Sequence, residues 1–164
     1  MIGGIRRDCI SRVGGDVWEA GVLPVAKAVA QWVGDISTGT GRFTAGETIS
    51  GGYDFRSRFA DGPGSNPEQL IAAAHAACFS MALANALAGE GHAVESIETH
   101  AEVTLRPVDG RPTIIRIALS TTGRVPGIEP EAFSALAAQA KAGCPVSRAL
   151  AGVPEITLES SLVT

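Results

Sequence analysis

The sequence lacks the paired cysteines of a structural zinc site or of a secreted disulfide scaffold. Its three cysteines, Cys9, Cys78 and Cys144, are an odd number, lie far apart and form no CxxC pair. Isolated cysteines of this kind are typical of a reducing compartment, where a cysteine is either inert or catalytic. No spacing of His, Asp and Glu indicates another metal site. We therefore expect a cytoplasmic protein without a bound metal.

The sequence also shows no excess of positive charge, no segment that resembles a signal peptide and no nucleotide-binding motif. The net charge is −4, so no basic surface attracts nucleic acid or an anionic membrane. Residues 1–24 place six charged residues among glycines, which is unlike the apolar core of a signal peptide. Neither GxGxxG nor GxxxxGK[ST] follows a predicted strand. We expect no nucleic-acid partner, no membrane association and no cofactor.

The length of 164 residues suits a single domain with a sizeable core. We interpret residues 25–164 as this domain and residues 1–24 as an N-terminal extension. The extension is a disordered segment, a short extra element or an upstream start, and the sequence leaves these alternatives open. Cys9 lies in the extension and has no expected role.

A single long helix is predicted between Ser65 and Gly91. Ser65 and Glu68 have the spacing of a capping box, whereas Asn66 followed by Pro67 offers an alternative start. Apolar side chains, mostly alanine, surround the interior, so we expect a central helix buried on most faces. Polar residues interrupt the stretch before it reaches the ~18 consecutive apolar residues of a membrane span. The expected apolar stripe consists of Ile71, Ala74, Cys78 and Met81.

The segments on both sides of this helix predict an α+β fold. Three strands at 26–33, 42–49 and 53–59 form an antiparallel meander, and the charged face of the third is interpreted as a solvated edge. Strands at 96–105 and 113–121 flank a hairpin turn at Asp109 and Gly110. A second helix covers 129–142, a short helix follows Pro145, and a last strand covers 156–163. The order shows no regular βαβ alternation that would suggest a doubly wound sheet.

Local sequence leaves the roles of two cysteines open. Cys144 precedes Pro145, and a thiol at the start of a helix is favoured as thiolate, but the residue could equally fill a tight turn. His75 lies three residues before Cys78 on the helix surface, and a Cys/His couple can activate a nucleophile. No Asn or Asp is placed to orient His75. This favours a core histidine, or a histidine that contacts residues of a site without touching the substrate. Cys78 alone would be interpreted as a small buried apolar residue.

Two longer motifs carry more information, namely SNPEQLIAAAHAACFSM at 65–81 and AKAGCPVS at 140–147. Both resemble the OsmC/Ohr family, the osmotically inducible and organic hydroperoxide resistance proteins, and are closest to the OsmC branch. The similarity extends from about Trp32 to Leu162. It implies an OsmC/Ohr-like α+β fold in an intertwined homodimer whose active sites lie at the shared interface.

The resemblance also implies a thiol-dependent peroxidase that reduces organic hydroperoxides to alcohols. Cys78 takes the position of the peroxidatic cysteine and Cys144 that of the resolving cysteine. Arg58 would hold Cys78 as thiolate, and Glu68 would orient Arg58. Attack on peroxide gives a sulfenic acid, which Cys144 captures as a disulfide, and an external dithiol, implied to be a lipoyl-bearing protein, resets the enzyme.

Alternatives remain at this point. Glu68 precedes Cys78 by ten residues, or ~15 Å along a straight helix, so either Arg58 bridges this gap or Glu68 comes from the partner chain. The two cysteines could also act in the reverse order. A peroxide-responsive redox sensor and a non-catalytic binding module on the same fold are the alternative functions.

Overall fold

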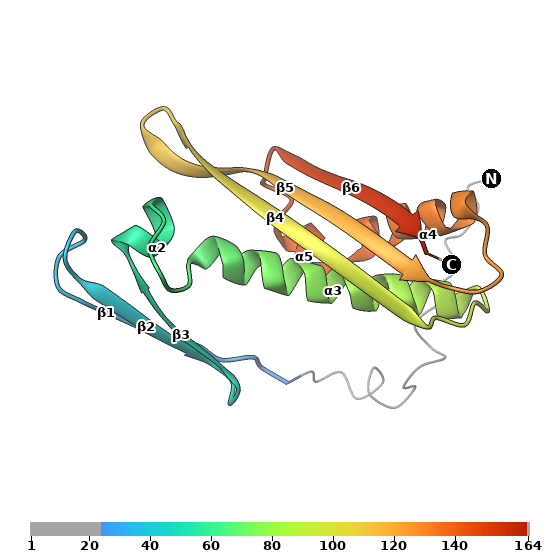
Figure 1. The fold of residues 1–164 in the computed structure, drawn as a ribbon, viewed down its shortest axis with the longest axis horizontal. Helices are drawn as coiled ribbons and strands as arrows, with labels where there is room; N and C mark the ends of the chain where they lie inside the picture. Colours follow the sequence, from blue (N-terminus) through green and yellow to red (C-terminus); the bar gives the residue numbers. More distant parts are fainter. Residues whose placement is uncertain (1–23, 164) are drawn as a thin grey trace, which may run out of the picture.

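The computed structural model describes residues 24–163. These residues form an α+β fold in the order predicted from the sequence, with one small helix added (Figure 1). The elements are β1 (Ala28–Val33), β2 (Thr40–Ala45), β3 (Ile49–Asp54), α2 (Phe55–Phe59), α3 (Pro67–Gly89), β4 (Ser96–Val108), β5 (Arg111–Arg124), α4 (Pro130–Gly143), α5 (Pro145–Ala149) and β6 (Glu155–Leu162).

The strands form two separate three-stranded sheets. The first is the expected antiparallel meander, β1-β2-β3. The second has the order β4-β5-β6, in which β4 and β5 form a long antiparallel hairpin and β6 runs parallel to β5. Figure 1 shows α3 lying along the second sheet, while the meander stands apart and joins the rest through α2.

Helix α3 begins with the second of the two predicted N-caps, Asn66, and not with Ser65. Asn66 is the N-cap, Pro67 occupies the first turn, and the Asn66 side chain accepts a hydrogen bond from the Gln69 N–H at 2.8 Å. Gln69 therefore completes the capping box, and Glu68 is free to bind another side chain. The helix ends before Gly91, whose positive φ of 86° is the left-handed conformation expected there.

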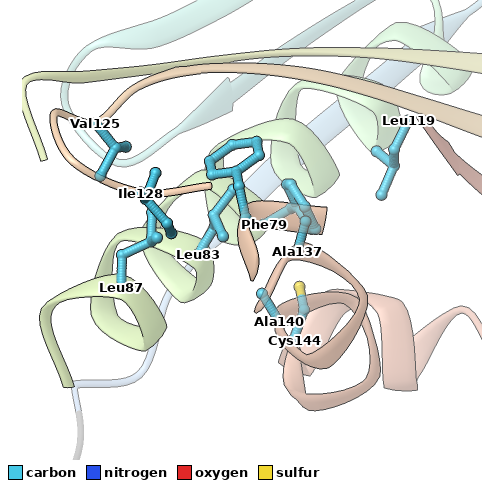
Figure 2. Packing of buried hydrophobic residues seen from close by; sticks show 10 residues of the cluster. Phe79, Leu83, Leu87, Leu119, Val125, Ile128, Ala137, Ala140 and Cys144 are labelled. Atoms are coloured by element: carbon cyan, nitrogen blue, oxygen red, sulfur yellow. The ribbon is translucent and has the colours of Figure 1, made fainter. Parts of the chain in front are cut away.

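The hydrophobic core lies between α3, α4 and the second sheet (Figure 2). On α3, the buried residues His75, Phe79, Leu83 and Leu87 recur every four positions and form a single stripe. The stripe predicted from the sequence is therefore wrong: Met81 is 74% exposed.

The expectation that α3 is buried on most faces is also wrong within a single chain. The second sheet and α4 cover one side of the helix only. The opposite side is apolar and exposed over Leu70, Ala73, Ala77 and Met81. A contiguous exposed apolar face of this kind is unusual on a monomeric soluble protein.

The third predicted strand, 53–59, is wrong in its second half. Strand β3 begins at Ile49, inside the segment predicted as strand two, and ends at Asp54, where the short helix α2 begins. The Asp54 carboxylate accepts a hydrogen bond from the Ser57 N–H at 2.7 Å, and the Asp54 N–H donates to the Ser57 hydroxyl at 3.0 Å. This capping box outweighs the alternating pattern and places Arg58 on a helical turn.

Helix α3 is long and apolar enough to cross a membrane by length and composition alone. In the fold it packs against β4, α4 and α5 and carries buried Glu68 and His75. One side of α3 thus belongs to the core of the fold.

Phe79 is the largest core side chain of α3 and is fully buried. Because its removal leaves a cavity that packed neighbours fill only partly, we expect Phe79→Ala to lower the free energy of unfolding by about 3–5 kcal/mol. Chemical denaturation measures the change. Val108→Ala, at a half-exposed position near the β4–β5 turn, is the control and should change the free energy by under about 1 kcal/mol. Equal effects of the two variants would contradict the assigned core.

Candidate active site

Two sulfur atoms from distant parts of the chain meet between α3 and α5. Cys78 lies in the middle of α3, and Cys144 is the N-cap residue of α5. The Sγ atoms are 3.3 Å apart, and both residues are free thiols. A disulfide needs about 2.05 Å, so a small movement would join them. Cys144 is fully buried beside Ala140 (Figure 2), whereas Cys78 is partly exposed.

The two thiols differ in acidity. Burial raises the pKa of Cys78, and the adjacent Cys144 thiol raises it further, although the Val146 N–H opposes both effects. Burial also acts against ionisation of Cys144, but hydrogen bonds from Ser147, Cys78 and Val146 outweigh it and lower the pKa of Cys144. Within one chain Cys144 is thus the more easily ionised thiol, and a positive charge beside Cys78 would favour its thiolate.

Arg58 and Glu68 form an ion pair between α2 and the first turn of α3. Nη2 of Arg58 donates to Oε1 of Glu68 at 2.8 Å, and Nε lies 3.2 Å and 3.3 Å from the two carboxylate oxygens. The Glu68 side chain is only 10% exposed, against 37% for Arg58. A buried carboxylate that binds two guanidinium nitrogens fixes the direction of the arginine. The pair borders a groove whose other wall is formed by Ala101, Val103 and Leu105 of β4.

The four predicted site residues therefore form two pairs. The structure brings Cys78 to Cys144 and Arg58 to Glu68, but no hydrogen bond or ion pair within residues 24–163 joins Arg58 to Cys78. Glu68 precedes Cys78 by ten residues on one continuous helix, which separates them by ~15 Å. Arg58 holds Glu68 and so stays at the far end of this span.

His75 of α3 and Ser147 of α5 form a further contact between these two helices. His75 is fully buried, and its Nε2 atom is 2.7 Å from the Ser147 hydroxyl. Burial lowers the pKa of His75, and the positive charge of Lys141 lowers it further, so the ring is neutral at pH 7. The sequence pointed to His75 but gave no reason to single out Ser147, whose only signal is its position three residues after Cys144 in a new helix.

No group of three or more His, Cys, Asp or Glu side chains that could hold a metal occurs in the part of the chain that the structure describes.

Comparison of the chain with known proteins identifies its family. Residues 60–159 match the model of the OsmC-like proteins. The chain belongs to the OsmC-like family. The match includes Glu68 and both cysteines and begins two residues after Arg58.

Curated members of the OsmC-like family include close relatives of the chain. Peroxiredoxin OsmC of Escherichia coli (strain K12) is 46% identical over 138 residues, which cover 83% of this chain and 95% of that protein. The organic hydroperoxide resistance protein OhrA of Bacillus subtilis (strain 168) is 34% identical over 95 residues, or 58% of this chain and 66% of that protein.

Solved structures show the same OsmC-like fold. The crystal structure of the organic hydroperoxide resistance protein OhrB of Bacillus subtilis is similar with a TM-score of 0.64 and 26% sequence identity. The alignment covers 87% of this chain and all of that chain. The OsmC/Ohr-like fold expected from the sequence motifs is confirmed.

Proposed function

We propose that this protein is a thiol-dependent peroxidase that reduces organic hydroperoxides to alcohols. The observation that supports the proposal most is the 3.3 Å separation of the Cys78 and Cys144 sulfurs, one of them accessible and the other buried. The relatives named peroxiredoxin and organic hydroperoxide resistance protein support the same chemistry.

The reaction needs two steps in the protein. The Cys78 thiolate attacks one peroxide oxygen, so that an S–O bond forms, the O–O bond breaks and the alkoxide takes a proton to leave as the alcohol. The Cys144 thiolate then attacks the sulfenic sulfur, an S–S bond forms, the S–O bond breaks, and the released hydroxide is protonated to water. An external dithiol reduces the disulfide and is itself oxidised, and we propose a lipoyl-bearing protein as the donor.

The exposure of the two cysteines supports the order in which we propose that they act. Cys78 has accessible surface, whereas Cys144 has none, so a bulky hydroperoxide reaches Cys78 first. Cys78 lies in an apolar, alanine-rich stretch of α3, which suits a substrate with an apolar organic group. The lower pKa of Cys144 suits a resolving thiol, which must be ionised when the sulfenic acid forms.

A positive charge beside Cys78 would come from a second copy of the chain. Exposed apolar side chains line the free face of α3 and the meander, including Leu70, Met81, Val29, Val33 and Ile49. We propose that an intertwined homodimer covers them, and that the Arg58–Glu68 pair of one chain lies beside Cys78 of the other. The arginine would stabilise both the thiolate and the departing alkoxide.

A disulfide that an external dithiol must reduce suits a reducing compartment, so we place the protein in the cytoplasm. The proposed reaction requires no metal or prosthetic group, because the thiols carry the electrons.

The variant Cys144→Ser should react with one equivalent of hydroperoxide and then stop. Cys78 would still form its sulfenic acid, but no second thiol could capture it. A sulfenic-specific tag with mass spectrometry should find the modification on Cys78. Cys9→Ser is the control and should form the Cys78–Cys144 disulfide. A tag on Cys144 in the Cys78→Ser variant would instead show that the two cysteines act in the reverse order.

Steady-state consumption of cumene hydroperoxide with a dithiol tests the whole function. We expect many turnovers per chain. Consumption that ends after one equivalent despite excess dithiol would indicate a redox sensor, and absence of both consumption and disulfide would indicate a binding module.

A further inference from the structure

The two aromatic side chains of α2 have no part in the reaction described above. Phe55 and Phe59 are the first and last residues of this short helix, and their ring centroids are 5.1 Å apart. The two residues are 41% and 43% exposed, and neither belongs to the hydrophobic core. Packing in the core therefore does not account for this pair of rings.

Phe59 also contacts the guanidinium of Arg58. The Cζ atom of Arg58 lies over the Phe59 ring, 5.2 Å from the ring centroid. A guanidinium within about 6 Å of an aromatic centroid is attracted by the negative face of the ring. In the strand predicted from the sequence, these two neighbours would point to opposite faces. The helical turn of α2 instead brings the ring and the cation together.

Glu68 and Phe59 hold different parts of the guanidinium. The Glu68 carboxylate accepts hydrogen bonds from Nε and Nη2, which form one edge of this planar group. The Phe59 ring contacts the face of the group and so limits the tilt of its plane. No hydrogen bond within residues 24–163 involves Nη1 of Arg58. The two N–H groups of Nη1 remain available to bind an anion.

We propose that Phe59 is a positioning residue that holds the Arg58 guanidinium by its face and so keeps Nη1 in place for the Cys78 thiolate and the departing alkoxide. This inference rests on the proposed function and deepens its first step. Phe55 packs against Phe59 from four residues earlier on α2 and limits the rotation of its ring. Phe59 acts only through Arg58 and does not touch the reacting atoms.

The first experiment weakens the contact while keeping the shape of the ring. Fluorine atoms withdraw electron density from an aromatic face, so each added fluorine weakens its attraction to a cation. In a Cys9→Ser, Cys144→Ser background, rapid quenching with a sulfenic-specific tag measures how fast cumene hydroperoxide oxidises Cys78. Mono-, di- and trifluorophenylalanine in place of Phe59 should slow this step progressively. The trifluorinated ring should slow it about two- to fivefold at pH 7, the weight of one exposed cation–π contact.

Phe43 of β2 is the matched control for the fluorinated series. Its ring is half-buried and packs against Tyr53, with centroids 6.3 Å apart. The same fluorinated residues at position 43 should leave the rate of sulfenic acid formation unchanged. An unchanged rate across the Phe59 series as well would overturn the inference.

The second experiment shows whether Phe59 acts through Arg58. In an Arg58→Ala background the trifluorinated ring should have no further effect, because the cation that it binds is gone. Slowing of the same size in that background would mean that the ring contacts the hydroperoxide itself, and would overturn the inference. Phe59→Leu keeps an apolar side chain without an aromatic face and should match the trifluorinated variant. Phe59→Tyr should keep the native rate.

The unfluorinated parent and its Arg58→Ala variant separate this inference from the proposed function. If the parent forms no sulfenic acid on Cys78, the proposed function fails and the inference fails with it. If the parent forms the sulfenic acid, and Arg58→Ala slows this step while the Phe59 series does not, the inference alone fails.

Discussion

The Cys78→Ser variant should lose peroxidase turnover, with the rate of hydroperoxide consumption falling by at least about 10³-fold. The serine hydroxyl is not ionised at neutral pH and is a far weaker nucleophile toward peroxide oxygen than a thiolate. It also cannot form the sulfenic acid that Cys144 resolves. Serine is nearly the size of cysteine, so the loss would report chemistry and not a cavity at the half-buried site on α3.

The measurement is steady-state consumption of cumene or tert-butyl hydroperoxide with dithiothreitol or dihydrolipoamide as donor. Cys9→Ser is the matched control, because it removes the third cysteine and should keep the native rate. Circular dichroism confirms that both variants fold. If Cys78→Ser consumes hydroperoxide as fast as the native chain, Cys78 is not the peroxidatic residue and the proposed function is wrong.

Much of the fold could be predicted because several segments have signals that agree with one another. The long helix has a cap, a proline in its first turn and closing glycines, and the β4–β5 hairpin has the Asp109–Gly110 turn. The 53–59 segment shows where such reasoning fails. Its alternation of aromatic and charged residues fits a strand, but the capping box of Asp54 and Ser57 begins helix α2. Alternation over seven residues is weak, and two specific hydrogen bonds at the cap outweigh it.

The site was harder to predict from local sequence. Cys78 and Cys144 are separated by 66 residues, and only the resemblance to a family paired them before the structure placed their sulfurs 3.3 Å apart. Ser147 was missed because a serine in a first helical turn is common, and only the fold shows His75 beside it. The face of α3 around Met81 was predicted to be buried because it is apolar. Composition alone does not show whether residues of the same chain cover such a face, and here they do not.

The Arg58→Ala variant should react with hydroperoxide about 10²–10³-fold more slowly at pH 7, because one preorganised positive charge at a developing anion contributes about this much. Burial already raises the pKa of Cys78, and removal of the arginine would raise it further. The thiolate fraction is lost below this pKa and regained above it. The rate of the variant should therefore recover in part as the pH rises. Stopped-flow measurement of sulfenic acid formation against pH checks the shift.

Arg116→Ala is a matched control for this variant. Arg116 also forms an ion pair with a glutamate, Glu155, at 3.6 Å, but on the exposed surface of β5 and β6. Its removal should leave the rate and the pH profile unchanged. Equal profiles for Arg58→Ala and the native chain would remove Arg58 from the site.

Mixing the Cys78→Ser and Arg58→Ala variants at pH 7 tests where the arginine acts. If each site combines Cys78 of one chain with Arg58 of the other, a dimer of Cys78→Ser and Arg58→Ala chains contains one intact site, since the first chain supplies Arg58 and the second Cys78. Random exchange of subunits makes about half of the dimers mixed, so about a quarter of the native activity should return. If instead Arg58 acts on its own chain's Cys78, every site in the mixture lacks one residue and no activity returns. The ~15 Å of helix between Glu68 and Cys78 favours the first result, because Arg58 remains bound to Glu68 in each chain.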